Sequence, residues 1–394
     1  MDVYCLEFAG EDDDFAAYEA ASAAAGVEPI APGLAIAGAI ERDRVRGLAY
    51  TRRASELLGR TDADLASARA CLAAADLDPD AGETVAVRAV DVRGSTSVST
   101  GEAERVLGQV LVDRGFGVDL EDPDRVLRVA FSAGRIEGST LDVPGSSSAT
   151  DPGSATDPDD PLDGAPDEPV SVCTIGWLEV ESVRDFQARK PTEKPFFQPG
   201  SMDPLLARAI ANVAGARQGA TLLDPMCGTG GVLVEAGLVG ANVLGTDAQA
   251  KMVRGARENL THYLDTDVST ADGDDTGKDG PDTTEDGDDE ASSDEIGDWY
   301  LARADATRLP LADDAADAVV FDAPYGRQSK IETHRLEDLV AGALTEARRV
   351  APRAIVVADR LWVDAIRDVG WTIEAAFERR VHRSLTRYVL VLER

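Results

Sequence analysis

The run Phe321-Asp-Ala-Pro-Tyr-Gly-Arg-Gln-Ser-Lys330 places an acid, a proline and an aromatic ring directly after an apolar stretch. Proline donates no backbone hydrogen bond, so a buried strand must end where it occurs. The carboxylate of Asp322, the backbone carbonyl of Ala323 and the ring of Tyr325 are then presented at the end of the strand, beside Pro324. What chemistry these groups serve depends on the ligand that lies next to them.

Other acids follow predicted strands in the same half of the chain, namely Asp224, Asp247 and Asp305. From about residue 170 onwards, short apolar runs alternate with helical patterns, the order expected of a doubly wound α/β sheet. Ligands bind such sheets outside the carboxyl ends of the strands. Because these acids and Asp322 all fall at predicted strand ends, we expect them to line one ligand site.

The turn after the first of these strands contains Gly228-Thr-Gly230, which also fits the glycine fingerprint of a dinucleotide site. Asp224 argues against that ligand, because a carboxylate at the turn would repel a pyrophosphate at the helix N-terminus. The turn also lacks the Gly-Lys-Ser/Thr ending of a P-loop. An acid there suits a cationic ligand instead, such as the amino group of S-adenosylmethionine (AdoMet). Gly228 and Gly230 would let the backbone approach the methionine part of AdoMet closely.

The rest of the predicted cofactor site follows from the order of the strands. Asp247 is placed to accept hydrogen bonds from the ribose hydroxyls, and Asp305 to accept one from the adenine amino group. Cys227, inside the glycine turn, is interpreted as a small side chain beside the cofactor and not as a nucleophile. These residues together predict AdoMet as the cofactor.

From about Asp185 to Arg394 the chain resembles the class I AdoMet-dependent methyltransferases. The likeness depends on Asp-Pro-Met-Cys-Gly-Thr-Gly-Gly at 224–231 and Asp-Ala-Pro-Tyr-Gly at 322–326. Within that class these motifs match the enzymes that methylate exocyclic amines, whose catalytic motif is usually Asp/Asn-Pro-Pro-Tyr/Phe. Ala323 stands in place of the first proline, and the family uses only the carbonyl of that residue.

The resemblance implies a role for each residue of the catalytic motif. Asp322 and the carbonyl of Ala323 would accept the N–H groups of the target amine, and Asp322 would also take its proton. Pro324 ends the strand, and Tyr325 would stack on a base that has left its duplex. The likeness also extends over residues 189–212.

The first half of the chain has a mixed α/β pattern. Strands are expected at 3–8, 33–40, 84–90 and 126–131, and helices at 14–25, 52–58, 64–75 and from Ser99 onwards. The segment Val118-Asp-Leu-Glu-Asp-Pro123 resembles the THUMP domain of RNA-modifying enzymes, which implies docking of a tRNA 3′ end. A small α/β domain with another use is the alternative.

Taken together, the two resemblances point to the archaeal enzymes that dimethylate guanine N2 at position 10 of tRNA. They imply transfer of one and then two methyl groups to that nitrogen. Two alternatives stay open. One is another exocyclic-amine methyltransferase, acting on N6 of adenine or on guanine N2 of rRNA. The other is a non-catalytic RNA-binding protein, against which the intact acids argue.

The predicted fold class is α/β. A Rossmann-like class I methyltransferase domain, with a mostly parallel seven-stranded sheet and an antiparallel edge strand, follows an α+β region. We expect a ferredoxin-like segment at 1–48, a THUMP domain at 49–142 and an acidic linker at 143–169. The methyltransferase domain would cover 170–394, with a solvated acidic insertion at 265–298 that carries no expected role.

The 394 residues carry a formal charge of −34, which would normally oppose binding to RNA. Acid-rich, lysine-poor composition is typical of surfaces adapted to molar salt, where the Debye length is only about 3 Å. The charge therefore does not exclude tRNA as partner, although an acidic protein without a polyanion partner is the alternative. The 4 cysteines are widely spaced and predict neither a zinc site nor disulfides. No apolar run suggests a membrane span, and we expect a cytoplasmic monomer.

Basic residues near the catalytic motif and near the C-terminus are candidates for RNA contacts. Arg327 and Lys330 follow the motif and would hold phosphate, or else simply lie in solvent. A second group surrounds the last two predicted strands and would contact RNA or pair with nearby acids: Arg379, Arg380, His382, Arg383 and Arg387.

Overall fold

The computed structural model describes residues 3–136, 138–143, 169–265, 296–324, 335–382 and 385–394. Its first sheet is eight-stranded. The strands of this sheet are β1 (Tyr4–Phe8), β3 (Glu28–Ala31), β4 (Leu34–Ala37), β6 (Thr51–Thr61), β7 (Thr84–Asp91), β8 (Gly117–Val118), β9 (Arg125–Gly134) and β10 (Val170–Glu181). They lie in the order β3-β4-β1-β6-β10-β9-β7-β8. Two short strands, β2 (Ala24–Ala25) and β5 (Ala39–Ile40), pair separately.

The helices that accompany this sheet are α1 (Asp13–Ala20), α2 (Arg42–Arg46), α3 (Leu65–Ala74) and α4 (Thr100–Asp113), with a short 3-10 turn, η1 (Val92–Gly94). The start of α4 is as predicted, since the hydroxyl of Ser99 accepts a hydrogen bond from the backbone N–H of Glu102. The strands expected near β1, β7 and β9 and the helix expected at 64–75 are also confirmed.

The prediction of a helix at 52–58 is wrong, because these residues form most of β6. This strand pairs antiparallel with β1 on one side and with β10 on the other. A central strand gains hydrogen bonds and packing from both neighbours, and that tertiary gain outweighs a local preference for helix.

The predicted start of the catalytic domain at residue 170 is also wrong. β10 hydrogen-bonds to β6 and β9, so residues 170–181 complete the first sheet. In the opposite direction, the segment before the predicted linker reaches the second sheet, where the N–H of Leu141 donates to the carbonyl of Ala376. The chain therefore crosses between the two halves more than once, and most of the linker itself lies outside the described residues.

The second sheet is seven-stranded. Its strands are β11 (Thr221–Asp224), β12 (Asn242–Asp247), β13 (Trp299–Arg303), β14 (Ala318–Asp322), β15 (Arg353–Ala358), β16 (Thr372–His382) and β17 (Leu385–Glu393). The order is β13-β12-β11-β14-β15-β17-β16, with β11 to β15 parallel and β17 antiparallel to both of its neighbours. This confirms the predicted mostly parallel sheet. The strand order reverses at β11, which makes its carboxyl end the topological switch point.

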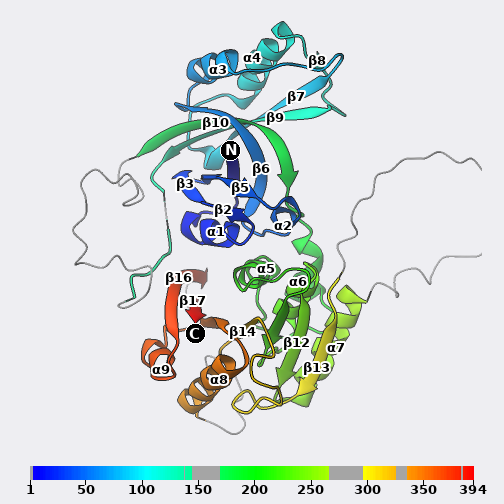
Figure 1. Cartoon of the computed structure of the whole chain (residues 1–394), viewed down its shortest axis with the longest axis vertical. Helices are drawn as coiled ribbons and strands as arrows, with labels where there is room; N and C mark the ends of the chain where they lie inside the picture. The colour runs from blue at the N-terminus through cyan, green and yellow to red at the C-terminus, as the bar shows by residue number, and fades with distance from the viewer. Residues whose placement is uncertain (1–2, 137, 144–168, 266–295, 325–334, 383–384) are drawn as a thin grey trace, which may run out of the picture.

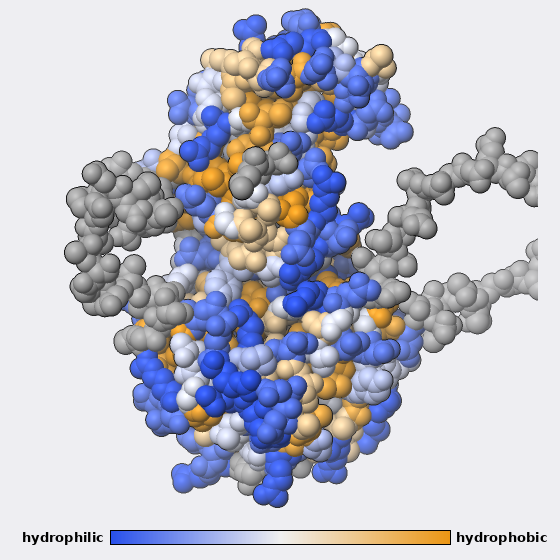
Figure 2. All heavy atoms as spheres, viewed as in Figure 1, coloured by the Kyte–Doolittle hydropathy of each residue, from blue (hydrophilic) through white to orange (hydrophobic). Residues whose placement is uncertain are grey.

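Helices cover both faces of this sheet (Figure 1). They are α5 (Pro204–Val213), α6 (Gly231–Gly237), α7 (Ala250–Leu264), α8 (Leu336–Val350) and α9 (Val363–Asp368), with the 3-10 turns η2 (Phe186–Arg189) and η3 (Pro191–Glu193) before α5. One apolar cluster lies under α5, α6 and α7 and a second lies under α8. The face of the molecule shown in Figure 2 is largely polar. Within the described ranges, no helix has the length and apolar character needed to cross a bilayer.

The two halves meet where α1 lies against α5 (Figure 1). Buried polar side chains connect them there. The carboxylate of Glu19 accepts hydrogen bonds from the N–H of Ala49 at 2.6 Å, the N–H of Tyr50 at 2.7 Å and the side-chain amide of Asn212 at 2.7 Å. Asn212 also donates to the carbonyl of Gly47 at 3.1 Å. A fully buried carboxylate with these donors fixes how the halves are docked.

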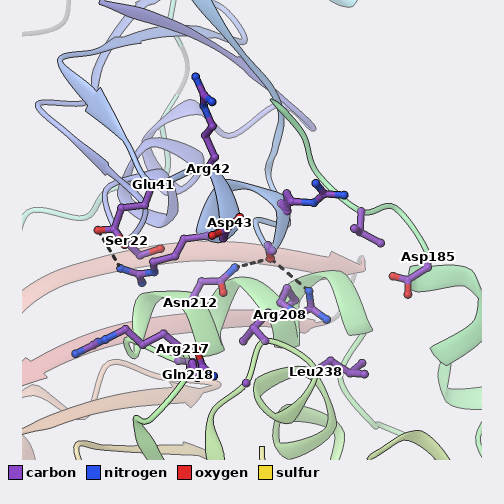
Figure 3. Close-up of a pocket in the computed structure, with 17 residues that line it drawn as sticks. Ser22, Glu41, Arg42, Asp43, Asp185, Arg208, Asn212, Arg217, Gln218 and Leu238 are labelled. Atoms are coloured by element: carbon purple, nitrogen blue, oxygen red, sulfur yellow. Dashed lines mark hydrogen bonds and ion pairs between the residues drawn. The ribbon is translucent and has the colours of Figure 1, made fainter. Parts of the chain in front are cut away.

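A cavity of about 990 Å³ lies at the same junction (Figure 3). Its walls come from α2 and from the loops that precede β11 and β12, around Arg217 and Val239. Those loops lie at the amino ends of the parallel strands. The cavity is therefore on the edge of the sheet opposite to the predicted acids, and it is not the predicted AdoMet site.

Candidate active site

The predicted acids end neighbouring strands of the second sheet. Asp224 is the last residue of β11, Asp247 the last of β12 and Asp322 the last of β14. Because β11 lies between β12 and β14 and is parallel to both, these carboxylates share one edge at the switch point. The structure thus brings together acids that are separated by up to 98 positions in the sequence.

Asp224 is the most buried of these acids, with 4% of its surface exposed. Its Oδ1 accepts a hydrogen bond from the N–H of Met226 at 3.0 Å. Burial raises the pKa of the Asp224 carboxyl well above its usual range, and the charges of Asp247 and Asp322 raise it further. Such a cluster of acids is best stabilised by a ligand that brings positive charge to it.

The charge of Asp224 should lower the stability of the ligand-free protein. The folded-state pKa of Asp224 lies well above 3.8, so the folded protein holds this proton more tightly than the unfolded chain does. The stability of the protein therefore falls as the pH rises from 3.8 through the folded-state pKa. Asp224→Asn keeps an oxygen for Met226 without the charge, so its unfolding temperature at pH 7 should exceed that of the wild type by roughly 2–4 °C per kcal/mol gained. Thermal unfolding at a series of pH values checks this. A variant-to-wild-type difference that does not grow with pH would contradict it.

Asp247 holds the glycine turn against the second strand. Its Oδ2 accepts from the N–H of Gly228 at 3.1 Å, and its Oδ1 accepts from the N–H of Gln249 at 2.8 Å. The N–H of Cys227 in turn donates to the carbonyl of Thr246 at 2.9 Å. The carboxylate therefore organises both the turn after β11 and the start of α7.

Glycine is needed at two positions of the turn for different physical reasons. Gly228 has φ +52°, and a Cβ there would meet nothing closer than the carbonyl of Met226 at 4.0 Å, so its missing side chain leaves open space. Gly230 has φ +74°, and a Cβ there would lie 2.7 Å from Leu260. Gly230 thus allows α6 to pack closely on α7, whereas Gly228 keeps room for a ligand. With the acids around it, this open turn fits AdoMet.

The environment of Cys227 agrees with a packing role. It is 6% exposed, and burial raises the pKa of its thiol well above the usual range, with the charges of Asp224 and Asp247 adding to the effect. A thiol that stays protonated is a weak nucleophile.

Asp305 lies two residues beyond β13, next to the outer edge of the sheet. Its Oδ1 accepts hydrogen bonds from the N–H of Thr307 at 2.9 Å and from the hydroxyl of Thr307 at 2.8 Å. The carboxylate shapes its own loop, and contact with adenine stays a prediction. Among the described residues, no group of acids, cysteines and histidines is arranged to hold a metal ion.

The catalytic motif ends its strand as predicted, with Asp322 as the last residue of β14. The N–H of Ala323 donates to the carbonyl of Val357 in β15 at 2.7 Å, and the Ala323 side chain is 2% exposed. Proline could not form this hydrogen bond. Alanine at this position therefore extends the pairing by one residue before Pro324. Other predicted site residues lie outside the described ranges: Tyr325, Arg327, Lys330 and Arg383.

Two arginines of the predicted basic cluster are paired with acids. The guanidinium of Arg379 pairs with Asp12 and donates to the hydroxyl of Tyr50 at 2.7 Å. Arg387 is 4% exposed, and its Nη2 lies 3.3 Å from Oδ2 of Asp322. Arg387 therefore belongs to the candidate site. Its position at the start of a strongly apolar strand is the one sequence signal for burial.

Asn259 of α7 is a further residue that the sequence did not single out. Its side chain accepts from the N–H of Phe196 at 2.9 Å and donates to the carbonyls of Phe196 at 3.0 Å and Thr229 at 2.8 Å. Ser201 lies 3.3 Å from the hydroxyl of Thr229. The segment 196–201 is thereby fastened over the glycine turn.

Known proteins are similar to this chain in sequence, and solved structures share part of its fold. Residues 191–389 match the family model described as RMKL-like, methyltransferase domain. A tRNA (guanine(10)-N2)-dimethyltransferase from Methanothermobacter thermautotrophicus is 30% identical over 88% of this chain and 83% of its own. One of the same name from Pyrococcus abyssi is 29% identical over 53% of this chain and 55% of its own. The crystal structure of TrmN from Thermus thermophilus is 19% identical, covers 100% of this chain and 99% of its own, and has a TM-score of 0.44.

The fold and the matched model define the second half of the chain as a class I AdoMet-dependent methyltransferase domain. Over most of its length, the chain belongs to the family of the tRNA (guanine(10)-N2)-dimethyltransferases.

Proposed function

We propose that the protein methylates the exocyclic N2 of guanosine at position 10 of tRNA, first once and then a second time. The observation that carries the proposal is that Asp322 of the catalytic motif ends β14 next to β11 and its glycine turn, at the switch point of the sheet. The family supports the choice of substrate, because the relative that matches 88% of the chain is named tRNA (guanine(10)-N2)-dimethyltransferase.

AdoMet supplies an electrophilic methyl group when it is bound. Asp224 would bind its amino group, Asp247 its ribose hydroxyls and Asp305 its adenine, while Gly228 leaves room for its methionine part. When ionised, these carboxylates offer acceptors only, which suits a cationic ligand that is rich in donors.

The residues of the catalytic motif would act on the target amine. The lone pair of guanine N2 is delocalised into the ring, so the amine is a poor nucleophile. Asp322 and the carbonyl of Ala323 would each accept an N–H, which aims the lone pair, and Asp322 would take the released proton. Fixing this geometry contributes much of the rate. Tyr325 would stack on the flipped guanine.

The front half is proposed to dock the 3′ end of tRNA. In the segment that resembles a THUMP motif, Val118 is 56% and Leu120 62% exposed, so their apolar side chains are available for contact. Arg327, Lys330 and Arg383 would contact phosphates. A tRNA substrate also favours a cytoplasmic location, and we propose that the protein acts there as a monomer.

Nucleoside mass spectrometry of tRNA tests the proposal. Unmodified transcripts incubated with enzyme and labelled AdoMet at molar KCl should gain N2-methylguanosine and then N2,N2-dimethylguanosine. A transcript with adenosine at position 10 is the matched control and should gain no label. N6-methyladenosine in that control would instead favour the N6-adenine alternative. Label at another guanosine would show that the enzyme methylates a position other than 10. No label in either transcript would overturn the proposal.

A further inference from the structure

We propose that Arg387 is a positioning residue, which holds Asp322 and the segment next to the glycine turn in the geometry that methyl transfer needs. This inference rests on the proposed function, because it assigns Arg387 a part in the same reaction. Arg387 has no place in the matched motifs and lies 65 positions beyond Asp322 in the sequence.

Arg387 comes from a strand that the fold places beside the site. β17 runs antiparallel to β15, which in turn pairs with β14. In the register between β15 and β17, Ala358 lies opposite Tyr388, so Arg387 extends beyond the carboxyl end of β15. The same edge of the sheet carries Asp322. The strand order of the sheet therefore places the guanidinium of Arg387 near the carboxyl end of β14.

The contact with Asp322 is made by a buried guanidinium and a partly exposed carboxylate. The side chain of Arg387 is 5% exposed and that of Asp322 27% exposed, and their nearest atoms are 3.3 Å apart. Burial of a guanidinium is costly unless a carboxylate and further acceptors surround it. Arg387 also brings positive charge to an edge where Asp224 and Asp322 are close enough to raise the pKa of Asp224. The guanidinium thus lets several carboxylates share one edge.

A second contact connects Arg387 to the predicted cofactor side. Its Nη2 donates to the carbonyl of Gly200 at 3.2 Å. The next residue, Ser201, bonds the carbonyl of Gln198 at 2.7 Å and lies 3.3 Å from the hydroxyl of Thr229 in the glycine turn. One guanidinium thereby connects the acid that would receive the amine with the segment fastened over the cofactor turn.

This geometry predicts a loss of rate more than a loss of binding. In-line attack is sensitive to displacement, and a shift of about 1 Å can lower the rate roughly 100-fold. Arg387→Met keeps a long side chain but neither charge nor donors, so we expect kcat to fall roughly 100-fold. Arg387→Lys keeps the charge but not the planar fork, and should lose about 10-fold, because a lysine cannot hold two acceptors in fixed directions. The affinity for AdoMet and the KM for tRNA should each change less than about threefold, since neither ligand is expected to touch Arg387.

A double-mutant cycle separates positioning from general support of the fold. Asp322→Asn retains an acceptor and should leave measurable activity. In that background Arg387→Met should lower kcat clearly less than the roughly 100-fold expected in the wild type, because the amide has already weakened the contact with Arg387, whereas the bond to Gly200 remains. Arg353→Met is the control, since Arg353 starts β15 at the opposite edge of the sheet and pairs there with Glu393 at 2.6 Å. It should lower the unfolding temperature but leave kcat unchanged.

The outcomes distinguish this inference from the proposed function. Wild-type enzyme that fails to methylate tRNA contradicts both. If the wild type is active, three results would overturn the inference alone. Arg387→Met could retain the wild-type kcat, or Arg353→Met could lower kcat equally. In the double variant, the fold-losses of kcat from Arg387→Met and Asp322→Asn could multiply in full. Calorimetric titration with AdoMet and thermal unfolding of every variant complete the set. A Met variant that is folded and binds AdoMet but transfers methyl groups slowly is the result that supports it.

Discussion

Asp322→Ala is expected to abolish methyl transfer while leaving the affinity for AdoMet within about threefold of the wild type. A positioned general base contributes roughly 100- to 10,000-fold to a rate, and here the same carboxylate also orients the amine. Removal of both functions should bring kcat below detection. The cofactor contacts proposed for Asp224 and Asp247 lie on other strands and stay in place.

Stopped reactions with labelled AdoMet measure the rate, and calorimetry measures the affinity. Asp317→Ala is a matched control, because Asp317 lies just before β14 at its other end, where it accepts a hydrogen bond from the N–H of Thr221 at 2.8 Å. That variant should keep its kcat. A loss of AdoMet affinity of roughly tenfold or more in Asp322→Ala would show that the carboxylate serves the cofactor instead of the amine.

The catalytic half was predictable because its signals are local. Buried parallel strands appear as short apolar runs, and the acid that ends each run is visible in the sequence. Since carboxyl ends of parallel strands meet at one edge, Asp224, Asp247 and Asp322 could be grouped before their distances were known. The left-handed φ of Gly228 and Gly230 likewise agrees with the choice of glycine.

The errors arose where a partner lies far away in the sequence. The residues of β6 look helical by composition, but their conformation is decided by β10, which pairs with them from more than 100 positions away. The same pairing explains the misplaced domain boundary. For Arg387 the sequence left open both contact with RNA and pairing with nearby acids, because its burial beside Asp322 depends on the antiparallel return of β17. The N–H of Ala323 likewise has its partner in another strand, at Val357 of β15.

The largest expected effect on stability is that of Glu235→Ala. Glu235 is fully buried in α6, where its Oε1 lies 2.7 Å from Nε of Arg189 and its Oε2 lies 2.9 Å from Nη2 of Arg208. Both arginines are themselves at most 6% exposed in their side chains. Removal of the carboxylate leaves two buried positive charges, a change that typically costs about 3–5 kcal/mol of unfolding free energy.

Chemical denaturation measures this cost, and Asp313→Ala is its control. Asp313 also pairs with an arginine, Arg349, at 2.8 Å, but its side chain is 76% exposed, so its removal should cost less than about 1 kcal/mol. Arg189 keeps Asp185 as a second partner at 2.6 Å, whereas Arg208 is left with weaker contacts, to the carbonyl of Gly47 at 3.4 Å, the Phe186 ring at 5.7 Å and the charge of Glu19. Adding Arg208→Met to Glu235→Ala should therefore restore part of the lost unfolding free energy. If the double variant is no more stable than the single one, the unpaired charge of Arg208 is not the cause.

Because α6 begins at the glycine turn, the destabilised protein should also bind AdoMet more weakly, in contrast to Asp322→Ala.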